Sequence, residues 1–95
     1  MVFMKPVIIY EQGNTKVYIN QCHAVGRKTK VFAVRKDDRT GLAEYLGSIV
    51  FNPRWRQYVF VPEKETIWSK SCLYNITSFL VTETRKWRDK LKQKG

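Results

Sequence analysis

A chain of 95 residues with 43% apolar and 14% aromatic content has room for one domain with one core, which excludes a multidomain protein and a wholly disordered chain. Its 18 Lys and Arg residues against eight acids give a net charge of +10, which favours a polyanionic partner, nucleic acid first among them. No apolar stretch approaches the roughly 18 residues that span a bilayer, and the first residues do not resemble a signal peptide, so we expect a cytoplasmic protein without membrane contact.

The N-terminal third predicts a β-hairpin. Residues 7–10 form a short run of β-favouring side chains, and residues 16–20 alternate between apolar and polar. Gly13 and Asn14 between them supply turn chemistry. A basic loop around Gly26 follows. We treat residues 1–28 as an N-terminal extension and residues 29–95 as the sheet and helix of the same single domain.

Three further strands are expected over residues 31–34, 45–51 and 57–61. The last two are joined by a tight turn at 52–54, where Asn precedes Pro. Both faces of 57–61 carry apolar side chains, so we predict that this strand is central in the sheet. Pro62 ends it, because proline cannot donate to a strand ladder.

A long helix is predicted at the C-terminus. Ser69 or Ser71 can cap its first turn. The apolar residues that recur at helical spacing are Leu73, Ile76, Leu80, Trp87 and Leu91, with Cys72 and Phe79 beside them. The fold class is therefore α+β, with an antiparallel sheet of four to five strands packed by one long C-terminal helix.

Residues for catalysis are scarce. His23 is the one histidine, and Cys22 and Cys72 lie far apart in the sequence, so the spaced ligand pairs of a zinc site are missing. The chain has no glycine-rich phosphate loop and no nucleophile elbow. We therefore expect no enzyme activity, no cofactor and no metal, and we expect both cysteines to be reduced thiols.

The positive charge lies at the two ends of the chain. Residues 1–36 carry seven Lys and Arg against one acid, residues 37–65 four against five, and residues 66–95 seven against two. Three segments are candidates for binding: a basic loop, the tip of the last hairpin, and the helix tail. Their candidate nucleic-acid-binding residues are Arg27, Lys28 and Lys30; Arg54, Trp55 and Arg56; and Arg85, Lys86, Arg88, Lys90 and Lys92.

Each segment has more than one interpretation. Trp55 between Arg54 and Arg56 could stack on bases, could form a protein-binding hot spot, or could fold back over the core. The tail over residues 85–94 could contact phosphate or an acidic groove on a partner, or could be a solvated helix end. The loop over residues 26–30 is a weak candidate by itself and adds to the tail.

The stretch from about residue 46 to 79 resembles a family of small, uncharacterised proteins of phages, prophages and mobile elements. The matching pattern is Leu46-Gly47, Trp55-Arg56-Gln57-Tyr58, Phe60, Pro62 and Cys72-Leu73. The resemblance covers about a third of the chain, and it implies an origin in a mobile element without a mechanism. Phe51 stands where the family often has Trp, and the N-terminal hairpin is not part of the pattern. Strands followed by a helix are also similar to the arm-type DNA-binding domains of phage integrases, an analogy of topology alone.

The sequence therefore favours a nucleic-acid-binding accessory protein of a virus or mobile element, acting on DNA inside the host cell. The alternative is a small protein-binding module or inhibitor that engages an acidic protein, with a homodimer as one possible form. Charge supports the first interpretation, and the Trp-Arg turn is compatible with both.

Overall fold

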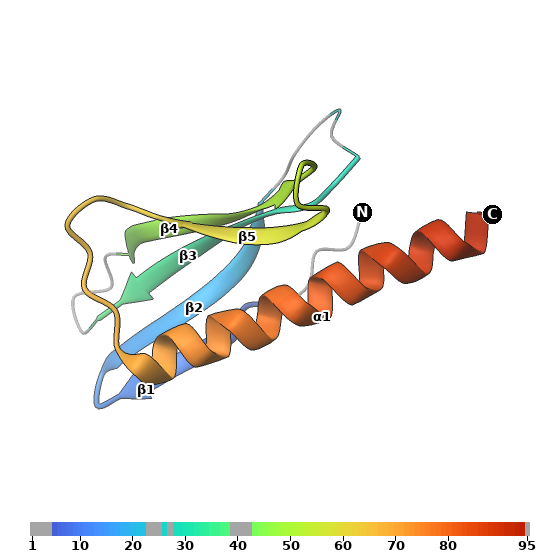
Figure 1. Cartoon of the computed structure of the whole chain (residues 1–95). Helices are drawn as coiled ribbons and strands as arrows, with labels where there is room; N and C mark the ends of the chain where they lie inside the picture. Colours follow the sequence, from blue (N-terminus) through green and yellow to red (C-terminus); the bar gives the residue numbers. More distant parts are fainter. Residues whose placement is uncertain (1–4, 23–25, 27, 39–42, 95) are drawn as a thin grey trace.

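The computed structural model describes residues 5–22, 26, 28–38 and 43–94, and it shows a five-stranded antiparallel sheet with one helix across it (Figure 1). The elements in chain order are β1 (Val7–Gln12), β2 (Thr15–Cys22), β3 (Val31–Asp37), β4 (Ala43–Asn52), β5 (Gln57–Pro62) and α1 (Lys70–Lys94). Each strand pairs with its sequence neighbours, in the spatial order β1-β2-β3-β4-β5. The predicted α+β class is confirmed, with five strands and a single C-terminal helix.

The core lies between one face of the sheet and α1. Alternate side chains of each strand point to this face, and the register places Ile19 opposite Val34 and Phe32 opposite Ile49. The helix contributes Ile76, which is fully buried, and Phe79, whose ring meets Phe32 edge to face at 5.0 Å. The buried cluster consists of Ile9, Val17, Ile19, Phe32, Val34, Leu46, Ile49, Tyr58 and Ile76.

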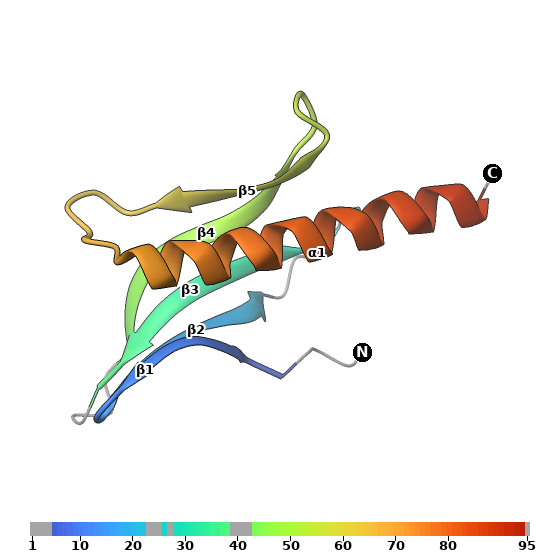
Figure 2. The same cartoon turned by 60° about the horizontal axis from the view of Figure 1, so that its bottom comes forward.

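The helix is tied to both edges of the sheet. Figure 2 shows α1 running across the strands, and its backbone comes closest to the first and last of them, β1 and β5. Asn75 Nδ2 donates a hydrogen bond to the Ile9 carbonyl at 2.6 Å, and the Tyr58 amide donates to Thr84 Oγ1 at 3.0 Å. Both edge strands are therefore held by a side chain of α1, which fixes the helix relative to the sheet.

The prediction that residues 57–61 form the central strand was wrong. β5 is an edge strand, and β3 lies in the centre. Tyr58 and Phe60 face the core, whereas Val61 points to the opposite face and is 49% exposed. In the described part of the chain no second layer covers that face, although β5 has apolar side chains on it. The sequence of β5 therefore has the same pattern as a strand that is buried on both sides.

The helix begins where the sequence predicted. Ser69 is the cap, because its Oγ accepts the Cys72 amide at 3.1 Å. The predicted apolar stripe is confirmed from Cys72 to Trp87 except at Leu73, which is 43% exposed, and Leu91 beyond it is 45% exposed. Leu91 lies in the last turns, where the helix continues beyond the strands (Figure 2). In the described residues no helix combines the length and apolarity needed to cross a membrane.

Candidate nucleic-acid interface

The turn between β4 and β5 presents Trp55 to solvent. Asn52 Oδ1 accepts the Trp55 amide at 3.1 Å, which closes the turn, and Arg56 adopts φ 55° in the left-handed region. The Trp55 side chain is 63% exposed. The interpretation in which Trp55 folds back over the core is therefore wrong, and an indole ring stands free at the tip of the hairpin.

Trp87 packs against the hairpin in its place. Its ring lies 4.5 Å from that of Phe51, measured between centroids, and the Arg56 guanidinium sits over the Trp87 ring, 5.5 Å from its centroid. Such a cation–π contact holds the arginine side chain against the helix. Arg56, which we predicted from the sequence as a candidate nucleic-acid-binding residue beside Trp55, thus contacts Trp87 and joins the hairpin to α1.

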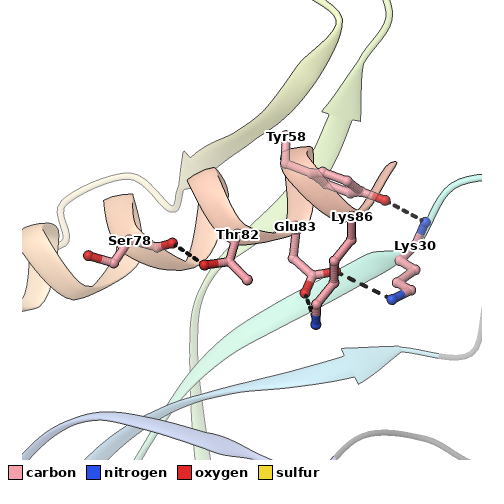
Figure 3. Close-up of polar contacts among 6 residues, drawn as sticks. All are labelled: Lys30, Tyr58, Ser78, Thr82, Glu83 and Lys86. Carbon is pink, nitrogen blue, oxygen red and sulfur yellow. Dashed lines mark hydrogen bonds and ion pairs between the residues drawn. The ribbon is translucent and has the colours of Figure 1, made fainter. Parts of the chain in front are cut away.

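A buried carboxylate connects the start of β3 with α1. Glu83 is 3% exposed, and its two oxygens lie 3.4 Å from Lys30 Nζ and 3.1 Å from Lys86 Nζ (Figure 3). The Lys30 amide also donates to the Tyr58 hydroxyl at 3.2 Å. Thr82, the residue before Glu83, donates from its Oγ1 to the carbonyl of Ser78 at 3.0 Å, four positions earlier on the helix. Three segments far apart in the sequence are joined at Glu83 and Tyr58.

The Tyr58 hydroxyl is held in its neutral form. Burial raises its pKa above the ordinary value of 10.0, the hydrogen bond from the Lys30 amide acts in the opposite direction, and the charge of Glu83 raises the pKa further. Protonated Tyr58 can still accept from the Lys30 amide, so this link persists at neutral pH.

The basic loop and the helix tail meet on one side of α1. Lys28 and Lys30, before β3, lie around a hollow of about 140 Å³ together with Lys86 and Lys90 of the helix. Trp87 forms part of the same lining. Cations that are more than 50 positions apart in the sequence are thus brought together by the packing of α1 on the sheet.

The hairpin tip and the helix tail meet on the other side of α1. An open groove of about 740 Å³ runs between β5 and the helix. Its lining includes Trp55 of the hairpin turn and Arg85, Arg88 and Lys92 of the helix. The complete lining is Trp55, Gln57, Tyr58, Val59, Phe60, Thr77, Leu80, Val81, Thr84, Arg85, Arg88, Asp89 and Lys92.

We refer to the predicted residues at this end of the molecule as the basic end. Its members are Lys28, Lys30, Arg54, Trp55, Arg56, Arg85, Lys86, Arg88, Lys90 and Lys92. Arg54 belongs through its place on the exposed hairpin turn. Arg27, also predicted as a site residue, lies outside the described residues. Figure 1 shows the hairpin turn and the last turns of α1 at the same end of the fold.

Glu83 and Tyr58 were not predicted as part of the site. The position of Glu83 in the sequence indicates its burial. Residues 76, 80, 83 and 87 recur at the spacing of the buried helix face, so the side chain at 83 is expected on that face. Lys86 at i+3 supplies a nearby cation. The second partner, Lys30, comes from another element and has no local signature.

Metal ligands do not gather in the described residues: no three His, Cys, Asp or Glu side chains there could hold an ion. Cys72 is buried in the first turn of α1, and Cys22 is half-buried at the end of β2. Comparison of the chain with protein-family models, curated proteins and solved structures finds no match.

Proposed function

We propose that the protein binds nucleic acid through the basic end. The observation that carries the proposal is the meeting of three separate cationic segments at one end of the fold. The basic end holds nine Lys and Arg residues, and the acids among them are Glu83 and Asp89. Glu83 is buried and pairs with Lys30 and Lys86, so it cancels one unit of their charge; nine cations less the two acids still leave a net charge of +7.

Such a concentration of like charge suits a polyanion. Each phosphate that a lysine or arginine neutralises releases a condensed counterion, which supplies affinity without regard to sequence. Lys28, Lys30, Lys86 and Lys90 surround one hollow, and Arg85, Arg88 and Lys92 line the groove on the other side of the helix. Phosphates could therefore be contacted on both sides of α1.

The biological setting that fits the proposal is an accessory role in a virus or mobile element. The pattern shared with small phage and prophage proteins supports this origin. A small basic protein that coats or delivers nucleic acid needs no catalytic group, and affinity for the phosphate backbone is sufficient for it.

The test is binding of fluorescein-labelled oligonucleotides, followed by fluorescence anisotropy over a salt series. The variant Lys90→Gln/Lys92→Gln removes two charges from the basic end, and Lys64→Gln/Lys70→Gln removes two from exposed positions elsewhere. We expect the first variant to reduce the slope of log affinity against log salt by about 0.7–0.9 per lost phosphate contact, and the second to leave it unchanged.

Two results would refute the proposal. One is the absence of binding to single-stranded and duplex oligonucleotides alike at low salt. The other is an equal loss of affinity in the two charge variants, because net charge alone, rather than the basic end, would then determine binding.

A further inference from the structure

The groove between β5 and α1 has walls of two chemical kinds. Trp55, Phe60, Leu80 and Val81 supply aromatic and apolar surface, whereas three cations and one acid lie along the helix side. Trp55 is the most exposed of the three tryptophans, since Trp68 and Trp87 are half-buried. A purely electrostatic site for phosphate would not require an apolar wall.

The groove also exposes polar backbone. β5 is the last strand of the sheet, and the Tyr58 amide points away from β4 to reach Thr84 Oγ1. Amides two residues apart on a strand point to the same edge, so the Phe60 amide points toward the groove as well. Pro62, the next in this series, has no N–H, which limits the open edge to the segment beside the groove. Gln57 adds a side-chain amide to the lining.

These features match unpaired nucleotides better than a duplex. In a duplex the faces of the bases are stacked on one another, and the protein meets phosphates and base edges only. In a single strand each base offers a free face, which stacks on aromatic side chains while cations follow the backbone. Arg85, Arg88 and Lys92 are three and four positions apart, so the helix places them in one row along the groove.

We infer that the β5–α1 groove holds a single-stranded segment of DNA or RNA, with a base stacked on Trp55 and phosphates along α1. The inference rests on the proposed function and narrows it to unpaired strands. Gln57 and the Phe60 amide then face the base edges. The protein therefore prefers single strands to duplex.

The experiment compares three labelled probes of one mixed sequence of about 20 nucleotides: single-stranded DNA, single-stranded RNA, and the blunt DNA duplex. Trp55→Ala is the test variant, and Tyr74→Ala is its matched control, because Tyr74 is an aromatic residue of α1 that is 71% exposed and lies away from the groove. Circular dichroism shows that both variants are folded. Intrinsic tryptophan fluorescence is recorded in parallel.

We expect the wild-type protein to bind one or both single strands at least tenfold more tightly than the duplex, and the tighter of the two identifies DNA or RNA as the ligand. Trp55→Ala loses on the order of tenfold in single-strand affinity and much less for the duplex, while Tyr74→Ala matches the wild type. Binding of a single strand quenches tryptophan fluorescence, and Trp55→Ala loses most of that quenching.

The inference is overturned if duplex binds as tightly as the single strands, or if Trp55→Ala leaves single-strand affinity unchanged. Either result leaves the proposed function intact, since a nucleic acid is still bound. Failure of all three probes to bind at low salt would instead remove the proposed function and the inference together.

Discussion

Replacement of Glu83 by glutamine should separate stability from binding. The carboxylate is buried between Lys30 and Lys86, and it joins the start of β3 to α1. Glu83→Gln preserves the size of the side chain and one acceptor oxygen, so it removes charge without opening a cavity. The substitution leaves two lysines beside each other without the anion that lay between them.

The magnitude follows from the exposure of the partners. Loss of one member of a fully buried pair costs about 3–5 kcal/mol, and an exposed pair contributes about 0–1 kcal/mol. Glu83 is 3% exposed, but the side chains of Lys30 and Lys86 are 47% and 61% exposed, so water screens both contacts. We therefore expect a decrease of about 1–2 kcal/mol in the free energy of unfolding, between the two limits.

Urea denaturation followed by circular dichroism measures this change. With a urea slope of about 2 kcal/mol per molar, the midpoint should fall by roughly 0.5–1 M. Asp89→Asn is the control, because it makes the same chemical change at an exposed position of the same helix and should shift stability by less than about 0.5 kcal/mol. A Glu83→Gln protein as stable as the wild type would refute the assignment of the carboxylate as a connection between β3 and α1.

Binding should change in the opposite direction. Glu83→Gln adds one net positive charge to the basic end and frees Lys30 and Lys86 to meet phosphate. We expect oligonucleotide affinity to rise, or at least to be maintained, at low salt in a variant that is less stable. A parallel loss of stability and affinity would instead mean that the ion pairs position the binding surface.

Three further predictions concern the sheet and its contact with α1. Gly47→Ala should lower the free energy of unfolding by about 1–3 kcal/mol in urea, because an added Cβ would lie 2.7 Å from the Val61 carbonyl oxygen and 2.9 Å from the Phe60 ring. Thr84→Val should cost about 1–3 kcal/mol in the same assay by leaving the Tyr58 amide unpaired, whereas Thr84→Ser should cost much less. The free energy of unfolding should fall above pH 10, because the unfolded chain loses the Tyr58 proton near the ordinary pKa of 10.0 whereas the folded protein, in which this pKa is raised, retains it. Urea unfolding at a series of pH values measures this fall, and the part of it that is due to Tyr58 should be absent in Tyr58→Phe.

The elements themselves were predictable because their signatures are local. The alternation over residues 16–20, the turn at Gly13 and the serine cap at Ser69 each depend on a few neighbouring residues, and all three occur as expected. Gly13 adopts φ 59°, a conformation that glycine takes without strain. The order of strands is less local, which is why β5 was placed in the centre. Apolar residues on the outer face of β5 indicate a central strand only if another layer of the protein covers that face of the sheet.

The positions of the cations can be read from the sequence, but their arrangement in space cannot. Counting charges identified the loop and the tail, yet only the packing of α1 across β1 and β5 places Lys28 beside Lys90. That packing also decides which aromatic residue is free. Trp55 and Trp87 are both flanked by cations in the sequence, and the burial of Trp87 against Phe51 leaves Trp55 as the exposed ring.

The location of the charge explains how the protein can carry it. Nine cations at one end repel one another, which opposes folding, and screening in physiological salt acts only beyond about 8 Å. The fold limits this cost by placing many of these cations on the last turns of α1, where they interact favourably with the negative end of the helix dipole. This part of the helix lies outside the core, since Leu91 is 45% exposed. Glu83 offsets the two lysines closest to the sheet. The surface best suited to a polyanion is therefore also a surface that contributes little to the core, so binding of phosphate would relieve a repulsion that the folded protein otherwise retains.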